Sequence, residues 1–507
     1  MSDIIIETKS GKITGYNNED AIQYLGIPYA RPPVGNRRFR RAEPVEKWNC
    51  TLSCDHFKNK AVQPDGGQIT PDNDIPQDED CLYLNIWTPS KKTEKIPEKK
   101  PVLVWIHGGA FTIGEASAVM YDGGNFARNG DIVFVSIQYR LGIFGFTDFS
   151  YLSDDELTFD TNIGLSDQIA ALRWIKENIE SFGGDCENIC LMGESAGASS
   201  VLAIMASPYS KNLFHKAISQ SGVCSSVLEK EMATLWAQKA MEHLGLEKND
   251  GKGLMHICPE QAADASLTLL STFTDIAPGA WPAGFIVDGD ILPMSIIEAF
   301  KTGNVLDIPL LIGTNKDEAA LFVRENSPWL PSTKEQVDRM FELNINLSKE
   351  DILANYPGHP DLPSLKEMGM EMCFTCDNTI IMDSHSKDND TYAYRFDYET
   401  IITKKLGIGS FHGMEIMFAF NNLDCELTSI LAHETSGPSI VSKNMHSYWI
   451  NFIKNSNPND NKSFIWEKYD GSLRPVLSIS EEMKTLHDPH KKAYNIWNDK
   501  TLYGLKR

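Results

Sequence analysis

The chain has 507 residues, and its 47 lysines and arginines against 69 aspartates and glutamates give a net charge of −22. This acid excess argues against binding to a nucleic-acid backbone, which needs a concentrated basic surface. Hydrophobic residues make up 42% and charged residues 23% of the chain. Such a composition can bury a large core and excludes a disordered chain.

The N-terminal segment MSDIIIETKSG contains only Ile4–Ile6 as an apolar run, which is too short for the core of a secretory signal. No apolar run in the sequence approaches the length that spans a bilayer. We therefore expect a soluble cytoplasmic protein that does not associate with membranes. In such a compartment most of the ten cysteines should be free thiols.

Two cysteine pairs could suggest a metal site. Cys373 and Cys376 form a C-x-x-C motif, and Cys186 and Cys190 lie four residues apart. Neither pair has a second cysteine or histidine pair at the spacing of a zinc site. We therefore expect no bound metal.

Five short runs of β-branched and aromatic residues alternate with helical patterns, as in a parallel sheet buried on both faces. These runs begin at Pro101, Asp131, Asn188, Ile308 and Thr391. Between the second and third runs, residues 164–184 predict an amphipathic helix that stops at Gly183. Its apolar stripe consists of Leu165, Ile169, Leu172, Ile175 and Ile179.

This alternation predicts an α/β fold with a large, mostly parallel central sheet flanked by helices. The length alone would allow about three domains. No repeat, low-complexity segment or linker divides the chain, so we expect one domain over residues 1–507 with long insertions. The charged stretch Lys91–Lys100 has no apolar periodicity and is expected to be a surface loop.

Ser195 is the candidate nucleophile. It is the central residue of the motif GESAG, which directly follows the third predicted strand and precedes a small-residue segment that can begin a helix. A sharp strand-to-helix turn presents a reactive serine and tolerates only small residues two positions to either side. The alternative is a glycine turn that contains an incidental serine.

A serine hydroxyl needs a general base, and the base needs an acid that orients it. In hydrolases with this type of sheet, the acid and then the histidine follow the nucleophile in the chain. Asp317 and Glu318 both come just after the fourth predicted strand, and the pattern does not choose between them. His412 lies between Gly409 and Gly413 in the loop after the fifth strand. Six other histidines follow the acid but lie outside such a loop: His359, His385, His433, His446, His487 and His490.

The segment HGGAF, which begins at His107, ends the first predicted strand. Small residues let backbone N–H groups approach a developing alkoxide and stabilise it. Together with the N–H of Ala196, this segment offers three candidate donors, namely Gly108, Gly109 and Ala196. The alternative is that the glycines only end the strand.

Ordered blocks along nearly the whole chain resemble the type-B carboxylesterase/cholinesterase family, and within it the bacterial para-nitrobenzyl esterases most. The blocks include GIPYARPPVGNRRFRRAEP from Gly26, EDCLYLNIW from Glu79, HGGAF, YRLGIFGF from Tyr139, GESAG, GTNKDE and FHGMEI. The resemblance implies the α/β-hydrolase fold. It also implies that the catalytic acid is the glutamate of the K-D-E block, Glu318.

Carried over position by position, the resemblance implies that Ser195 is the nucleophile, His412 the general base and then acid, and Glu318 the residue that orients it. The same comparison implies an oxyanion hole formed by Gly108, Gly109 and Ala196.

Six further residues match positions around the family's active site or in its scaffold. Glu194 matches a carboxylate that lines the pocket and stabilises the imidazolium. Ser221 matches a hydroxyl near the acid. Two structural ion pairs are also implied: Arg38 with Glu79, and Arg140 with Asp167.

Departures from the family pattern bear on the substrate. Cholinesterases bind choline with a tryptophan about ten residues before the cysteine of the E-D-C block. This chain has Pro71 there and no tryptophan from Val62 to Cys81, which disfavours choline esters.

The family's first disulfide would use Cys81, but residues 60–64 contain no cysteine, so we expect Cys81 to be a free thiol. Ala319 replaces the usual glycine and would cost roughly 1 kcal/mol if its φ were positive.

The sequence thus predicts a serine carboxylic-ester hydrolase that forms an acyl-enzyme on small to medium esters. It should need no metal or organic cofactor, bind a small-molecule ester as its only partner, and exist as a monomer or small homo-oligomer. A lipase and a feruloyl or xenobiotic esterase use the same triad and remain alternatives. A non-catalytic, cholinesterase-like binding protein is the alternative from another class.

Overall fold

The computed structural model describes residues 4–18, 21–65, 75–90, 98–324, 329–432, 436–460 and 463–507. Most of the predicted surface loop at residues 91–100 lies outside these ranges, as do Pro71 and His433.

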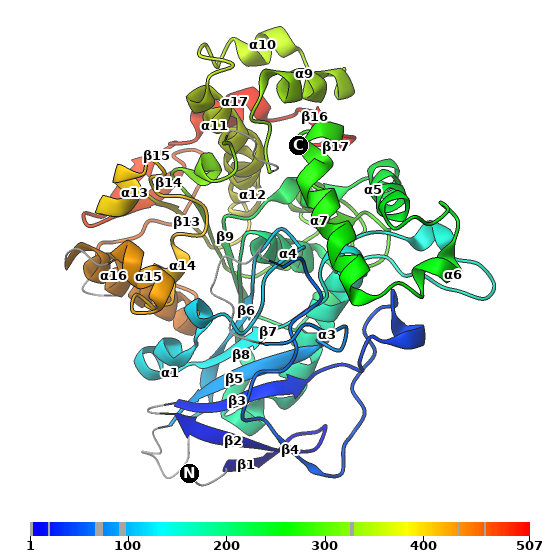
Figure 1. Ribbon diagram of the computed structural model, residues 1–507. Coiled ribbons are helices and arrows are strands. Elements are labelled where there is room, and N and C mark those ends of the chain that lie inside the picture. The colour runs from blue at the N-terminus through cyan, green and yellow to red at the C-terminus, as the bar shows by residue number, and fades with distance from the viewer. Residues whose placement is uncertain are drawn as a thin grey trace.

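A 13-stranded sheet forms the centre of the molecule (Figure 1). In spatial order its strands are β1 (Ile4–Glu7), β2 (Lys12–Asn18), β3 (Ala21–Pro28), β5 (Tyr83–Pro89), β7 (Val133–Ile137), β6 (Lys100–Ile106), β8 (Gly184–Glu194), β9 (Lys216–Gln220), β12 (Leu310–Asn315), β13 (Thr391–Phe396), β14 (Pro475–Ile479) and β15 (Lys484–His487), with β4 (Thr51–Ser53) paired to β2. From β7 to β14 all neighbours are parallel.

The predicted mostly parallel sheet is confirmed in its centre, and each of the five predicted strands is present. Both edges of the sheet differ from its centre, because β1, β2, β3, β5 and β7 pair in antiparallel fashion, as do β14 and β15. These antiparallel edges were not predicted from the apolar runs.

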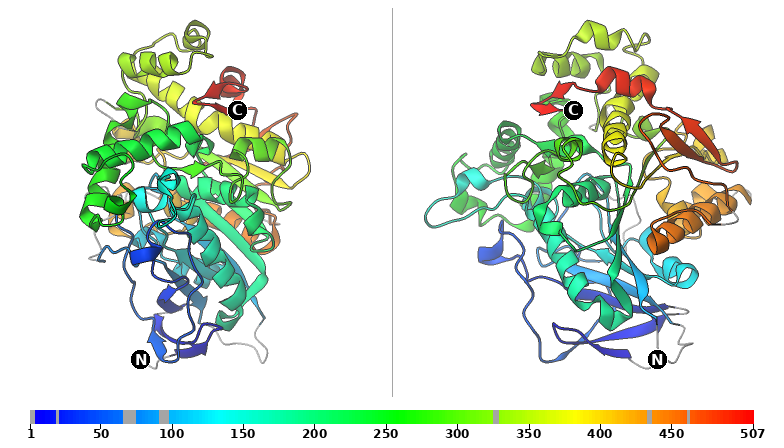
Figure 2. Two further views of the ribbon diagram at one scale, coloured as in Figure 1. Left: turned by 90° about the vertical axis from the view of Figure 1, so that its right-hand side faces the viewer. Right: turned by 180° about the vertical axis from the view of Figure 1, so that it is seen from behind.

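The helices cover both faces of the sheet (Figure 2). Alternate residues of β6 show this directly, since Val104 contributes to one apolar core and Trp105 to the other. Helices α3 (Ile163–Asn178) and α4 (Ala196–Ala206) pack on the first face, and α1 (Gly124–Gly130), α14 (Ile416–Ala419) and α16 (Ser436–Asn455) pack on the second.

Helix α3 confirms the predicted amphipathic helix. The residues of its apolar stripe from Leu165 to Ile175 are buried, and so is Ile179 in the turn that follows. The last turn, Ile179–Phe182, tightens into a 3₁₀ helix that ends at Gly183, whose φ is +80°. A left-handed residue at this point favours glycine, as predicted.

Long insertions after β9 and β12 gather at the upper end of the molecule in Figure 1, above the carboxyl ends of the parallel strands. They contain α5 (Lys230–His243), α7 (Pro259–Ile276), α9 (Lys334–Leu343), α10 (Lys349–Leu353), α11 (Leu362–Met370) and α12 (Cys376–His385). Between α11 and α12 the chain forms a π-helical turn at Glu371–Thr375. These insertions supply one wall of the cavity described below.

Both predicted ion pairs are confirmed. Arg140 Nη2 lies 2.6 Å from Asp167 Oδ1 with both side chains buried, and Arg38 pairs with Glu79.

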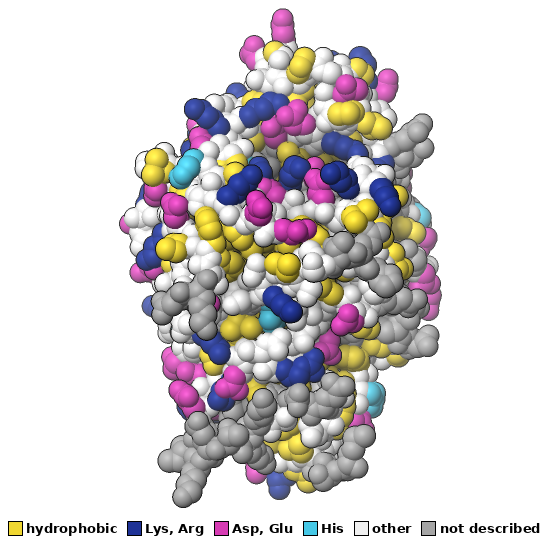
Figure 3. Space-filling view, turned by 90° about the vertical axis from the view of Figure 1, so that its left-hand side faces the viewer, with side chains coloured by type: hydrophobic (Ala, Val, Ile, Leu, Met, Phe, Trp, Pro, Cys, Tyr) yellow, Lys and Arg dark blue, Asp and Glu magenta, His cyan; other side chains and the backbone are white. Residues whose placement is uncertain are grey.

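All ten cysteines fall in described segments and are free thiols, including the buried Cys81. Over the described ranges, every helix is too short or too polar to cross a bilayer. On the face drawn in Figure 3, lysines and arginines are interspersed with acidic side chains.

Candidate active site

Ser195 occupies the turn between β8 and α4 with φ +56° and ψ −122°. A residue other than glycine in such a conformation costs about 1–3 kcal/mol, so the surrounding structure must hold it there. The backbone does so at both ends of Ser195, because its N–H donates to Gln220 O at 2.9 Å and its carbonyl accepts from Ser199 N at 2.9 Å.

The two glycines of the motif are required by close backbone contacts. A Cβ on Gly193 would lie 2.4 Å from the carbonyl of Gly197, and one on Gly197 would lie 2.1 Å from Ile106 O. Real Cβ atoms essentially never approach other atoms so closely. The spacing of the two glycines is therefore built into the strand-to-helix turn and into the packing of α4 against β6.

The loop after β6 carries two of the three expected oxyanion donors. Gly109 has φ +113°, and a Cβ there would meet Ile113 O at 2.0 Å. A Cβ on Gly108 would meet the Glu194 carboxylate at 2.6 Å and Ser195 Cβ at 3.0 Å. Within the described segments, no protein acceptor takes the N–H of Gly108, Gly109 or Ala196.

His107 anchors this loop rather than acting on a substrate. Its ring stacks on Tyr139 with centroids 4.4 Å apart, and the Tyr139 hydroxyl donates to the His107 carbonyl at 2.6 Å. Burial lowers the pKa of His107 to about 4, so the ring stays neutral. The contacts between His107 and Tyr139 thus hold the loop that presents Gly108 and Gly109 in place.

Glu318 and His412 meet across the carboxyl ends of β12 and β13. His412 Nδ1 lies 2.6 Å from Glu318 Oε2, and Glu318 Oε1 accepts the N–H of Asn315 at 2.6 Å. The Glu318 side chain is completely buried. Each carboxylate oxygen therefore has a donor, and Nε2 is the His412 nitrogen that makes no hydrogen bond within the described residues.

Asp317, the other acid that the spacing left open, has a different position. Its Oδ2 accepts the N–H of Ser410 at 2.9 Å, and its own N–H donates to Ser410 O. A Cβ on Gly409 would collide with the Asp317 carboxylate at 2.2 Å. Asp317 thus fastens the loop that carries His412, which explains the glycine before it.

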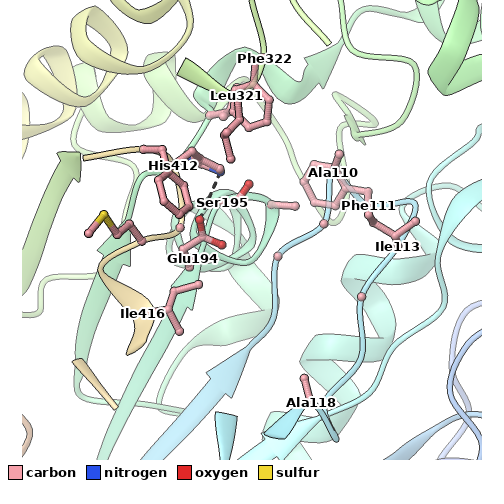
Figure 4. A pocket seen from close by; sticks show the side chains of 18 of the residues that line it. Ala110, Phe111, Ile113, Ala118, Glu194, Ser195, Leu321, Phe322, His412 and Ile416 are labelled. Carbon is pink, nitrogen blue, oxygen red and sulfur yellow. Dashed lines mark ion pairs between the residues drawn. The ribbon is translucent and has the colours of Figure 1, made fainter. Parts of the chain in front are cut away.

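His412 Nε2 faces a second carboxylate, because it lies 3.2 Å from Glu194 Oε1 (Figure 4). Ser195 is their neighbour in the same view. Among the described residues, no hydrogen bond joins Ser195 Oγ to His412 Nε2. The structure therefore brings the three expected residues together without closing the contact between serine and histidine.

Spacing arguments missed a third buried carboxyl group, that of Glu415. It accepts hydrogen bonds from Asn315 Nδ2 and, at 3.2 Å, from Gln220 Nε2. It comes three residues after His412 within the FHGMEI block, which is the one signal that could have indicated it. Three carboxyl groups thus lie near one imidazole in the core of the site.

Two of these acids have raised pKa values. Burial, together with the charges of the neighbouring carboxylates, raises the pKa of Glu194 to about 8 and that of Glu415 to about 7, although the His412 charge acts in the opposite direction. Burial by itself lowers the pKa of His412, but the charges of Glu194 and Glu318 and the hydrogen bond that His412 donates to Glu318 raise it to about 9. Perturbed groups of this kind cluster at functional sites.

The remaining expectations have plainer outcomes. Ser221 is buried with φ +57°, and its hydroxyl has no hydrogen-bond partner in the described part of the chain. Its role near the acid stays a prediction. Ala319 lies in a 3₁₀ turn with negative φ, so the cost considered for a positive φ does not arise. His385 and His446 are both buried. His385 Nδ1 is hydrogen-bonded with the Thr391 hydroxyl and His446 Nδ1 with the Ala419 carbonyl, so neither is placed as the base for Ser195.

A cavity of about 290 Å³ lies beside Ser195 and His412. Its lining is largely apolar and includes the glycine loop that begins at Gly108 (Figure 4). The volume is close to the lower limit for sites that bind small organic molecules. A strained serine, an oriented histidine and unpaired N–H groups therefore share one cavity.

Comparison with known proteins agrees with this geometry. The model of the carboxylesterase family matches residues 2–497. The para-nitrobenzyl esterase of Bacillus subtilis (strain 168) is 33% identical over 97% of this chain and 98% of its own, and carboxylesterase 1E of Rattus norvegicus is 32% identical over 98% and 93%. The solved structure of a thermophilic para-nitrobenzyl esterase superposes with a TM-score of 0.88 at 32% identity and covers 98% of this chain and all of that one. The fold is that of the α/β-hydrolases, and the chain belongs to the carboxylesterase family.

Proposed function

We propose that the protein hydrolyses small to medium carboxylic esters through an acyl-enzyme on Ser195. The observation that carries the proposal is the buried hydrogen bond between Glu318 and His412, which leaves Nε2 free in the cavity that Ser195 lines. A histidine oriented in this way is the base that a serine nucleophile needs. The name of the relative from Bacillus subtilis, a para-nitrobenzyl esterase, agrees with this size of substrate.

In the first half of the reaction, Ser195 Oγ forms a bond to the ester carbonyl carbon while His412 Nε2 takes the hydroxyl proton. The carbonyl oxygen becomes an oxyanion, and the unpaired N–H groups of Gly108, Gly109 and Ala196 stabilise its charge. When the bond to the alkoxy oxygen breaks, Nε2 gives the proton to the leaving alcohol. The hydrogen bond between serine and histidine often forms fully only in the substrate complex.

In the second half, His412 Nε2 takes a proton from water, and the hydroxide attacks the acyl carbon. The bond to Ser195 Oγ breaks, the serine regains the proton, and the carboxylic acid leaves. Glu318 stabilises the imidazolium in both halves without taking its proton. Glu194, 3.2 Å from Nε2, adds to that stabilisation. The chain's own groups handle every proton and charge in these steps.

Replacing the nucleophile tests the proposal. The variant Ser195→Ala should lose hydrolysis of para-nitrophenyl acetate by about 10⁴-fold or more, because no other group can form the acyl-enzyme. Its thermal unfolding should stay close to that of the unchanged protein. Wild-type hydrolysis by this variant would overturn the proposal.

A further inference from the structure

The π-helical turn at Glu371–Thr375 carries one wall of the active-site cavity. It contains Phe374, whose side chain is fully buried and lines the cavity. The Phe374 ring lies 5.1 Å from the His412 ring, centroid to centroid, and stacks nearly parallel to Phe322 at 6.0 Å. Phe322 itself lies 4.9 Å from His412. The two phenylalanine rings thus pack on the imidazole and limit its movement.

The conformation of this turn is uncommon. π-Helical turns are rare, occur mostly as single insertions between α-helical segments, and are frequent at functional sites. A π-helical turn holds one residue more than an α-helical turn. Relaxation of Glu371–Thr375 to α-helical geometry would therefore change the direction of its side chains. Contacts that fix the turn also fix Phe374 against His412.

Arg507 contacts the chain on both sides of Phe374. Its guanidinium donates a hydrogen bond from Nη2 to the Met372 carbonyl, and its Nε lies 2.8 Å from Asp377 Oδ1. The side chains of Arg507 and Asp377 are 4% and 0% exposed. One buried guanidinium thus joins a carbonyl inside the π-helical turn to the first turn of α12.

The segment that carries Arg507 lies at the upper end of the molecule, where the insertions gather (Figure 1). It consists of α17 (Lys491–Trp497), β16 (Thr501–Leu502) and β17 (Leu505–Lys506). The N–H of Arg507 donates to Lys500 O at 3.0 Å, and its guanidinium carbon lies 5.8 Å from the centre of the Trp497 ring. This separation allows a cation–π contact. Arg507 is therefore held by its own segment before it reaches the turn.

Helix α17 also holds the beginning of the turn. Trp497 Nε1 donates to the Tyr356 hydroxyl at 2.8 Å, and this hydroxyl donates to Glu371 Oε2 at 2.6 Å. Glu371 is the first residue of the π-helical turn. The segment from α17 to Arg507 thus supports the turn from its first residue to the start of α12.

We propose that Arg507 is a positioning residue for His412: it fixes the π-helical turn and, through Phe374, the imidazole ring. This inference rests on the proposed function, in which His412 takes the proton of Ser195. A misplacement of about 1 Å caused far from the chemistry can lower a rate about 10²-fold. Loss of the Arg507 contacts should loosen the ring packing without removing any group of the triad.

A variant that neutralises the buried pair tests the proposal. Asp377→Asn/Arg507→Met leaves no charge buried without a partner, so thermal unfolding should stay near that of wild type. The donor to the Met372 carbonyl is nevertheless lost. The kcat for para-nitrophenyl acetate, counted per Ser195 that an organophosphate labels, should fall about tenfold.

The matched control is Asp383→Asn/Arg474→Met. Asp383 is a second aspartate of α12, and its Oδ2 lies 2.7 Å from Arg474 Nη2. In the described part of the chain, no hydrogen bond joins this pair to the π-helical turn. The control should keep kcat within about twofold of wild type. An equal fall in the control would contradict the special position of Arg507.

The variant Phe374→Leu tests whether Arg507 acts through the phenylalanine ring. Phe374→Leu should lower kcat by itself, because the ring contact with His412 is lost. Combined with Asp377→Asn/Arg507→Met, it should lower kcat less than about threefold further, since changes that act through one contact are not additive. A merely structural role of Arg507 would instead make the two effects multiply.

Arg507→Lys provides a second variant if the neutral pair fails to fold. It keeps a positive charge beside Asp377, but one ammonium group does not reproduce the planar fork that reaches both Asp377 and Met372. Its kcat should also fall severalfold. Wild-type kcat in a folded Arg507 variant, or effects that multiply with Phe374→Leu, would overturn the role of Arg507 and leave the esterase proposal intact. A wild-type protein that neither hydrolyses para-nitrophenyl acetate nor takes the organophosphate on Ser195 would overturn the proposed function and this inference with it.

Discussion

Two buried charged clusters in this molecule differ in their charge balance. In the scaffold, Arg140 and Asp167 form one pair joined by two hydrogen bonds of 2.8 and 2.6 Å, with a net charge of zero. In the site, the carboxyl groups of Glu194, Glu318 and Glu415 lie near a single imidazole. A matched pair needs no proton uptake, whereas an excess of buried acids raises proton affinity.

The difference separates a part of the molecule that stabilises the fold from one that serves chemistry. Asp167 is fully buried and paired with Arg140, so the pair belongs to the scaffold. The site instead holds groups whose pKa values are raised into the range from about 7 to about 9. Substitutions in the first cluster should change folding, and those in the second should change rate or pH dependence.

The largest expected effect is on the acid that orients His412. Glu318→Gln should lower kcat about 10⁴-fold, because the amide cannot stabilise the imidazolium and permits the wrong tautomer. Steady-state kinetics with para-nitrophenyl acetate measures this. The matched control is Asp317→Asn, which keeps an acceptor for Ser410 N–H and should lower kcat less than about tenfold. The reverse ranking of the two variants would show that the acid has been assigned wrongly.

The next effect concerns the oxyanion loop. Gly109→Ala should lower kcat about 10²–10³-fold, because the new Cβ would lie 2.0 Å from Ile113 O and displace a donor N–H. Gly303→Ala is the control, since Gly303 also has a positive φ of +73° but has open space around it. If the two variants kept equal kcat values per labelled active site, Gly109 would have no part in the oxyanion hole.

In the scaffold, Asp167→Asn should lower the free energy of unfolding by about 3–5 kcal/mol, because it leaves the Arg140 charge buried without a partner. Denaturant unfolding measures this loss. Activity per labelled active site should stay within about twofold of wild type. Asp160→Asn removes a partner of Arg40, whose side chain is 41% exposed, and should cost less than about 1 kcal/mol. Equal costs for both variants would contradict the distinction between buried and exposed pairs.

The smallest expected effect is a shift of the pH profile. His412 must be neutral to accept the serine proton, so activity falls as the pH drops below its pKa. Since Glu194 and Glu318 raise that pKa toward about 9, the acid limb of kcat/KM should lie above pH 6.5, the ordinary value for histidine. Glu194→Gln removes a carboxylate that stabilises the imidazolium and should move the limb down by about one unit. An unchanged or higher limb would exclude Glu194 from this role.

Much of the site could be predicted because its chemistry depends on local backbone geometry. Gly193 is required by a contact with Gly197 inside one strand-to-helix turn, and Gly183 ends the 3₁₀ turn after α3 for an equally local reason. The buried strands of the sheet centre show in their apolar runs. Resemblance to the family then chose Glu318 over Asp317, which spacing could not do.

The rest depends on contacts between segments far apart in the sequence. Asp317 and Glu318 are adjacent, and only the 3₁₀ turn that follows β12 directs one toward His412 and the other toward Ser410. Glu415 is held in the site by hydrogen bonds from Asn315 and Gln220, which come from two different strands. The rings of Trp281, Phe322, Trp329 and Phe374 beside the cavity come from the two insertions after β9 and β12, and no periodic pattern links them. The antiparallel edges of the sheet were not predicted, because the sequence of one strand does not show which other strand pairs with it.

The most direct test of the central claim is to trap the nucleophile. After incubation with diethyl para-nitrophenyl phosphate, peptide mass spectrometry should find one diethylphosphoryl group per chain, on Ser195, and hydrolysis of para-nitrophenyl acetate should fall in step with labelling. Glu318→Gln should slow the labelling, because the same base activates the serine for both reactions. A protein that keeps its esterase activity with Ser195 unmodified, or that carries the label on another residue as activity is lost, would contradict the account.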